Sequence, residues 1–186
     1  MRKKLLTLSL IVICAAILAA GTLAYFSDDA TAHNVITTGG VVIELVETGE
    51  DGKPFPSEGV TGVMPGESVT KRVTVKNTGL SEAWVRVRAD MEVKDSTGKV
   101  MTGEHPIELT GKDSKWVAKG GYYYYTEPVA PGAETDALLE EVTFLPQMGN
   151  PYQGSTLNID IFAQATQVAN NGETVWEAQG WPEINS

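Results

Sequence analysis

The chain has 186 residues, of which 14 are Lys or Arg and 24 are Asp or Glu, and its net charge is −10 at pH 7. So acidic a composition lacks the basic footprint that nucleic-acid binding requires, which excludes nucleic acid as a partner. The length suits a single domain with a sizeable core.

The N-terminus has the three-part pattern of a secretory signal. Basic residues at positions 2–4 precede an apolar run at positions 5–20, and Thr22-Leu23-Ala24 places small residues at the positions that a signal peptidase reads. A retained transmembrane anchor is the alternative, but the run is shorter than the ~20 residues that span a bilayer. We therefore expect cleavage between Ala24 and Tyr25 and secretion of the protein. Contact with the membrane is expected only through the leader before it is cleaved.

Cleavage would divide the chain into three parts. They are a signal peptide at 1–24, an N-terminal segment at 25–39 and one β-sandwich domain at 40–186. Cys14 is the only cysteine and leaves with the leader, so the secreted chain would hold no disulfide. The stability of the domain must then come from packing and hydrogen bonds.

The remaining chain is patterned as β-structure. Apolar and polar residues alternate over 40–48, 68–79, 83–93 and 155–168, and turn residues such as Pro131-Gly132 separate these runs. The pattern predicts an all-β fold, a jelly-roll-like sandwich of two sheets with at most one or two short helices. Only Glu134 to Val142 looks helical, with a loop leading into a strand as the alternative. The inward-facing residues expected for 83–93 are Val85, Val87, Ala89, Met91 and Val93.

Aromatic residues supply the candidate interface. Tyr122, Tyr123, Tyr124 and Tyr125 are consecutive, so in a strand one pair faces the core and the other pair faces outward. Trp84 falls on the polar face of its predicted strand, where a sheet edge, a loop or a partner subunit are the three alternatives for what it covers. Exposed aromatic surface is typical of protein interfaces. A loop that covers the outer tyrosines is the alternative, and carbohydrate stacking is a third use.

No catalytic constellation is visible. The two histidines, His33 and His105, do not form a His-Glu-x-x-His metal motif, and no Gly-x-Ser-x-Gly nucleophile elbow or phosphate-binding loop occurs. Acidic pairs such as Asp28-Asp29 carry the oxygen ligands that Ca²⁺ prefers, but without the ordered spacing of a calcium loop. We predict no enzyme, no metal site and no cofactor, and a Ca²⁺ site at these acidic pairs is the alternative.

The stretch "GTLAYFSDDATAHNVITTGGVVIEL" resembles the leader junction of the TasA/camelysin family of exported proteins. The matching residues are Gly21, Thr22, Ala24, Tyr25, Phe26 and Asp28. "MPGESVTKRVTVKNTG" and "YQGSTLNIDIFAQATQ" are similar to later strands of the family. The run from Trp116 through the tyrosines to Thr135 resembles the clostridial, BsaA-like branch.

The resemblance implies a jelly-roll subunit of extracellular biofilm-matrix fibres, found in the matrix or at the cell surface. The implied partners are further copies of the chain, a SipW-type signal peptidase and other matrix components. It also implies donor-strand complementation, in which the freed N-terminus of one subunit completes a sheet of the next. The anchors would be Tyr25, Phe26, Val35 and Ile36.

Two other functions remain open. One is a camelysin-type cell-surface metallopeptidase, and the other is a monomeric adhesin or carbohydrate-binding module that uses the tyrosine face. A disordered N-terminal tail is the alternative to a donor strand.

Overall fold

The computed structural model describes residues 34–37, 40–56, 63–111 and 113–182. The predicted leader, its cleavage site and the anchors Tyr25 and Phe26 lie outside these residues. The described chain is built of nine strands and two single-turn 3₁₀ helices. The strands are β1 (Asn34–Thr37), β2 (Ile43–Thr48), β3 (Ser68–Asn77), β4 (Ala83–Lys94), β5 (Ile107–Thr110), β6 (Trp116–Lys119), β7 (Tyr122–Tyr125), β8 (Leu139–Phe144) and β9 (Thr156–Gln167).

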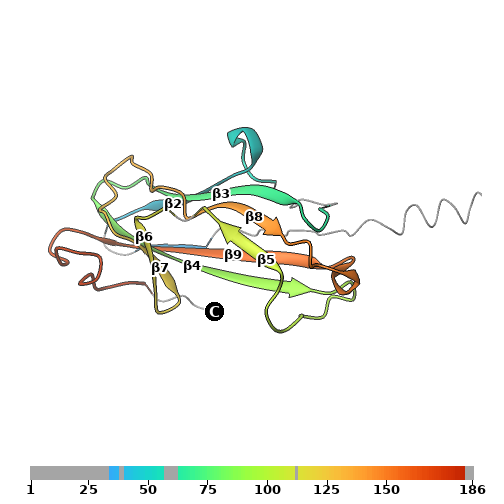
Figure 1. The fold of residues 1–186 in the computed structure, drawn as a ribbon. Coiled ribbons are helices and arrows are strands. Elements are labelled where there is room, and N and C mark those ends of the chain that lie inside the picture. The colour runs from blue at the N-terminus through green and yellow to red at the C-terminus, as the bar shows by residue number, and fades with distance from the viewer. Residues whose placement is uncertain (1–33, 38–39, 57–62, 112, 183–186) are drawn as a thin grey trace, which may run out of the picture.

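The strands form two layered sheets (Figure 1). One has five strands in the order β1-β9-β4-β7-β6, and the other has four in the order β2-β3-β8-β5. Every connection crosses between the sheets except the β2–β3 and β6–β7 hairpins. This repeated crossing is the pattern of a jelly-roll-like sandwich, so the predicted all-β sandwich is confirmed.

Alternating side chains from both sheets fill the space between the layers. The core of the sandwich includes Val73 and Val75 of β3, Val85 and Val87 of β4, and Ile159 of β9, none of them more than 1% exposed. The longest predicted strands, 68–79, 83–93 and 155–168, form β3, β4 and β9 with ends within two residues of the prediction. The period-two pattern was enough to predict the extent of these strands, because one face of each strand is buried.

The helix predicted at Glu134 to Val142 is wrong, and the alternative loop forms instead. Thr135 exchanges hydrogen bonds with Val75: its amide donates to the Val75 carbonyl at 2.9 Å, and its hydroxyl accepts from the Val75 amide at 3.0 Å. The Leu138 amide then donates to the Val73 carbonyl. These contacts hold the segment extended along β3 until β8 begins. The only helices in the described residues are the 3₁₀ turns Glu50–Gly52 and Asn150–Tyr152. Among the described residues, no helix has the length and apolar character needed to cross a membrane.

Candidate functional site at the sheet edges and the aromatic face

The N-terminal strand lies at an edge of the five-stranded sheet. β1 pairs in parallel with β9 of the same chain, from Asn34 opposite Phe162 to Thr37 opposite Ala165. Two of the predicted donor anchors, Val35 and Ile36, therefore belong to a strand in their own sandwich. The pairing covers only four residues of the 12-residue β9. Asn34, the first residue that the structure describes, thus lies in an edge strand.

The four tyrosines form β7 and alternate between the two faces of the sheet, as a strand requires. Tyr125 is 5% exposed and packs on Trp116 with ring centroids 5.0 Å apart, and Tyr123 also contacts the core. Gly120 and Gly121, with φ of +59° and +80°, form the two-residue turn that joins β6 to β7. The turn sets which tyrosines point inward.

Tyr122 and Tyr124 lie on the outer face around Arg86. The Arg86 guanidinium lies 4.1 Å from the Tyr122 ring centroid and 4.6 Å from that of Trp181, and its Nε donates to Gln164 Oε1 at 2.7 Å. The C-terminal segment 168–182 supplies the aromatic neighbours of this cluster. This segment covers part of the surface of the outer tyrosines. The alternative of a loop that covers them therefore holds for part of the outer face.

Trp84 is buried under the same C-terminal segment. Its side chain is 2% exposed and packs in a small cluster with Val175 and Ala178. The sequence makes Trp84 an interface candidate because it breaks the polar face of its strand. In the structure Trp84 packs against a loop segment of its own chain, which is one of the alternatives, and it presents no surface to a partner.

A charged cluster closes the end of the core beside β6 and β7. Asp136 accepts a hydrogen bond from the Tyr125 hydroxyl at 2.7 Å and pairs with Lys115 Nζ at 3.0 Å. These two contacts hold the pKa of Asp136 below its usual value, the hydrogen bond from Tyr125 being the larger cause. Burial and the hydrogen bond to Asp136 raise the pKa of Tyr125. The hydrogen bonds to Asp136 and Glu127 raise the pKa of Lys115.

The signs of these shifts define a pH window. The contribution of ionised Asp136 is complete above its usual pKa of 3.8 and is lost as the pH falls through the lowered value. The contribution of neutral Tyr125 is complete below 10.0 and is lost as the pH rises through the raised value. Between these two pH limits the charged cluster therefore stabilises the fold, which is a structural role.

Comparison with protein families gives a match over the N-terminal part of the chain. Residues 1–105 match the sequence model of a family described as camelysin metallo-endopeptidase, which is more than half of the 186 residues. The chain belongs to the camelysin family. A search of curated proteins gives no match.

The description of the camelysin family directs attention to possible metal ligands. His105 Nδ1 lies 3.2 Å from the Tyr152 hydroxyl, with the two rings at 90°, and His33 lies outside the described residues. In the ranges 34–37, 40–56, 63–111 and 113–182, no three His, Cys, Asp or Glu residues gather closely enough to hold a metal ion. The acidic pair Glu50-Asp51 lies in an exposed 3₁₀ turn, and Asp28-Asp29 is outside the described residues.

The burial of one lysine in this camelysin-family chain was not predicted from the sequence. Lys71 is 0% exposed, with its Nζ 3.4 Å from Glu47 Oε1 and 4.1 Å from the Phe55 ring centroid. The alternation of β3 does indicate this burial, because Lys71 lies on the same inward face of the strand as Val69 and Val73. Its partner on β2 could not be assigned without the pairing of β2 and β3.

Proposed function

We propose that this chain is a secreted structural subunit of extracellular biofilm-matrix fibres, joined by its N-terminal segment through donor-strand complementation. The observation that carries the proposal is the position of β1, the first strand that the structure describes, at an edge of the five-stranded sheet. Membership of the camelysin family, the sandwich fold and the signal-like leader support it. The proposed sites of action are the extracellular matrix and the cell surface.

The proposed joint uses ordinary strand addition. An extended segment that adds to a sheet edge gains backbone hydrogen bonds for affinity and alternate side-chain contacts for register. Each buried anchor, such as Tyr25 or Phe26, contributes about 1.5–3 kcal/mol. Because the donor and acceptor surfaces differ, the contact is heterologous and does not close on itself, so repetition gives a fibre. A SipW-type signal peptidase would free the donor, and other matrix components would meet the finished fibre.

Removal of residues 25–33 is expected to abolish fibre formation and leave the fold intact. A chain of residues 34–186 keeps β1 and every other strand that the structure describes. Negative-stain electron microscopy of chains 25–186 and 34–186 at equal concentration should show fibres for the first and monomers for the second. Circular dichroism should be the same for both. If both chains form fibres, the contact between subunits does not depend on residues 25–33. If both remain monomers and bind glycans, the adhesin function is favoured.

A metallopeptidase is the second candidate, because the matched family is described as a metallo-endopeptidase. We propose that the chain has no catalytic role and binds no cofactor. Chelator-sensitive cleavage of casein by the purified chain, lost in His33→Ala or His105→Ala, would establish the peptidase function instead. Cleavage that is unchanged by chelator and by both substitutions would indicate a contaminating protease.

A further inference from the structure

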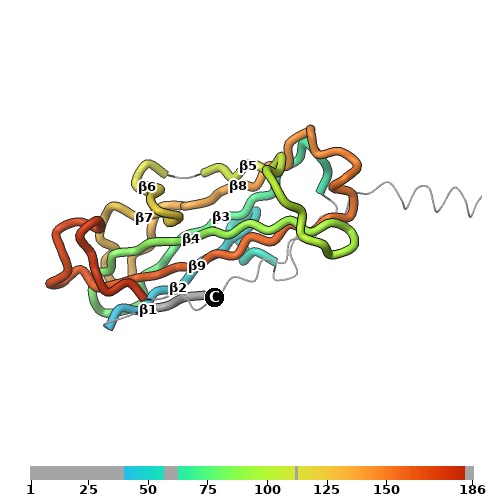
Figure 2. The backbone as a smooth tube through the Cα atoms, turned by 90° about the horizontal axis from the view of Figure 1, so that it is seen from below, coloured from blue at the N-terminus to red at the C-terminus, as the bar shows by residue number. Residues whose placement is uncertain are grey.

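Part of one edge of β4 has no partner strand among the residues that the structure describes. β9 pairs with β4 along all 12 residues, from Ala83 to Lys94. On the opposite side, β7 pairs only with Arg86 and Val87, and Val100 bridges only Lys94. Between these contacts, no described strand pairs with residues 88–92, which we call the open edge of β4 (Figure 2).

The backbone at this edge is ready to accept a strand. Ala83 exchanges two hydrogen bonds with Val129, and the Val93 carbonyl accepts a hydrogen bond from the Met101 amide, both on this side of β4. Because backbone groups alternate along a strand, those of Ala89 and Met91 also point to this side. No described residue hydrogen-bonds to them there. An unpaired row of amides and carbonyls is the template that strand addition uses.

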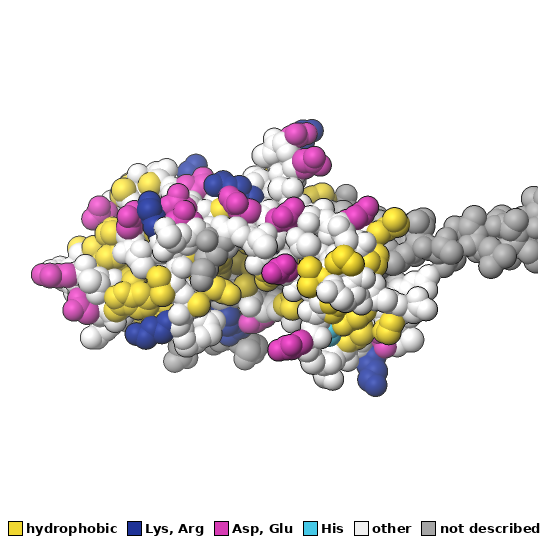
Figure 3. All heavy atoms as spheres, viewed as in Figure 1, with side chains coloured by type: hydrophobic (Ala, Val, Ile, Leu, Met, Phe, Trp, Pro, Cys, Tyr) yellow, Lys and Arg dark blue, Asp and Glu magenta, His cyan; other side chains and the backbone are white. Residues whose placement is uncertain are grey.

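The side chains at the open edge show that the core is incomplete there. Met91 occupies an inward position of β4, where the sequence predicts burial, yet it is 40% exposed, as is Leu109 on β5. The corresponding inward residues on β9, Leu157, Ile159 and Ile161, are at most 1% exposed. Figure 3 shows hydrophobic side chains gathered on the face of the molecule that carries β5 and β7.

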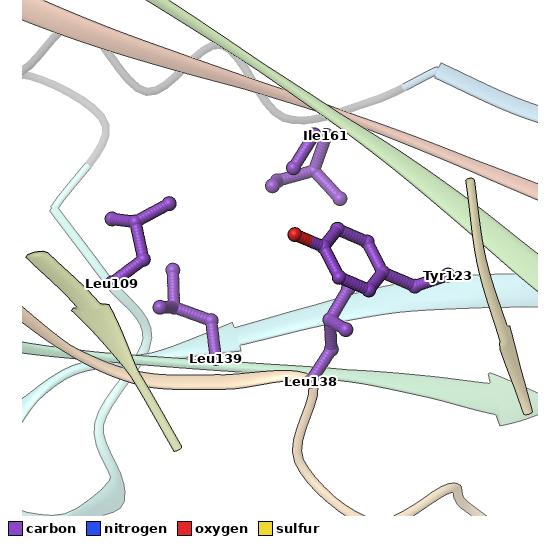
Figure 4. A pocket seen from close by; sticks show the side chains of 6 residues that line it. Leu109, Tyr123, Leu138, Leu139 and Ile161 are labelled. Carbon is purple, nitrogen blue, oxygen red and sulfur yellow. The ribbon is translucent and has the colours of Figure 1, made fainter. Parts of the chain in front are cut away.

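A cavity of about 190 Å³ opens at the same place. It is bounded by Ala89, Leu109, Tyr123, Leu138, Leu139 and Ile161. Figure 4 shows Tyr123 reaching into this space from β7, with Leu109 and Leu139 on its far side. Because an apolar cavity of about 150 Å³ holds a benzene molecule, the volume suits one aromatic side chain.

We propose that the open edge of β4 is the acceptor for residues 25–33 of a second copy of the chain, with Tyr25 or Phe26 filling the cavity. This assignment rests on the proposed function and names its acceptor. The nine residues that precede β1 span about 30 Å when extended, longer than the five-residue gap requires. β1, which they precede in the sequence, lies on one side of the β9–β4 pair, while the open edge lies on the other side. Donor and acceptor on opposite sides produce a linear, non-closing chain of subunits.

Disulfide trapping tests the assignment, because the chain from Tyr25 onward contains no cysteine. In that chain, Phe26→Cys is combined with Leu109→Cys at the cavity, and in a matched control with Asp160→Cys on β9. A parallel pair of variants uses Tyr25→Cys. Non-reducing gels of oxidised fibres should show a ladder of covalent multimers for at least one Leu109 combination and none for the Asp160 combinations.

The other outcomes separate the acceptor from the function. Fibres with a ladder only for Asp160, or with no ladder at all, would overturn the β4 acceptor and leave the fibre function standing. Folded chains that form no fibres before substitution would overturn the proposed function itself. A disulfide within monomers would show that the segment binds its own chain, and would overturn the exchange between copies.

A charge at the cavity gives a second, independent measure. Leu109→Lys places an ammonium where the donor ring would be buried, and is expected to raise the critical concentration for fibre formation by at least about tenfold. Val117→Lys is the matched control, since Val117 is 39% exposed on the edge strand β6 and does not line the cavity. Equal critical concentrations for the two variants, both folded, would overturn the assignment.

Discussion

Trp84→Ala is expected to destabilise the fold by about 3–5 kcal/mol, the usual cost of truncating a buried tryptophan. The side chain is 2% exposed between the outer face of β4 and the C-terminal segment, against Val175 and Ala178. Its loss leaves a cavity that only movement of segment 168–182 could close. Urea denaturation followed by circular dichroism measures the change.

Trp176→Ala is the matched control, since Trp176 belongs to the same segment and is 43% exposed. It packs on Tyr124 with ring centroids 5.2 Å apart, and its truncation should cost about 1 kcal/mol. If the two variants lose equal stability, the C-terminal segment does not cover Trp84 in solution. Protease treatment of Trp84→Ala should also release the C-terminal segment sooner than in the unchanged chain.

Asn77→Ala is expected to cost about 2–4 kcal/mol, because it removes a side chain that ties three parts of the backbone together. The Nδ2 of Asn77 donates to the carbonyls of Ser81 and Val129, each at 2.8 Å, and its Oδ1 accepts from the Gly79 amide at 2.9 Å. The residue is 0% exposed, so water does not readily replace these bonds. The free energy of unfolding from urea titration is the measurement.

Two further variants sharpen the test of Asn77. Asn77→Asp retains an oxygen for the Gly79 amide but faces the two carbonyls without a donor, so it should be at least as destabilising as Asn77→Ala. Asn150→Ala, at an exposed position, should change stability by no more than about 0.5 kcal/mol. If Asn77→Ala lowered the free energy of unfolding as little as Asn150→Ala does, the Asn77 side chain would not tie these three parts of the backbone together.

Local pattern was enough to predict the long strands but not their partners. The residues of β4 alternate so regularly that its extent could be predicted within one residue. The bonds that Asn77 makes could not be predicted, because they reach Val129, 52 positions along the chain. Pairings of that separation depend on the strand order, which period-two alternation does not encode.

The two faces of the sheet were predicted with unequal success, for a physical reason. Inward positions follow one rule, burial of apolar side chains, and Val85, Val87 and Val93 obey it. Outward positions depend on what covers them, and Trp84 is buried by a C-terminal segment with no regular pattern. Met91 is the informative exception on the inward side, because it is exposed where β4 has no neighbouring strand among the described residues.

The candidate site could be predicted in part. The resemblance at the leader junction directed attention to the N-terminal segment, and the structure places residues 34–37 of that segment at a sheet edge. The open edge of β4 could not be anticipated, because it arises where β7 ends early against a longer strand. Only the lengths and registers of β4, β7 and β9 together reveal it.

The central claim is that the N-terminal segment of one copy binds the sandwich of another. A synthetic peptide of residues 25–36, titrated calorimetrically into a chain of residues 34–186, tests it without requiring fibres. We predict saturable binding of one peptide per chain, weakened by replacing both Tyr25 and Phe26 with serine, and shortening of fibres when the peptide is added to chain 25–186. Absence of binding under conditions where chain 25–186 forms fibres would contradict the claim.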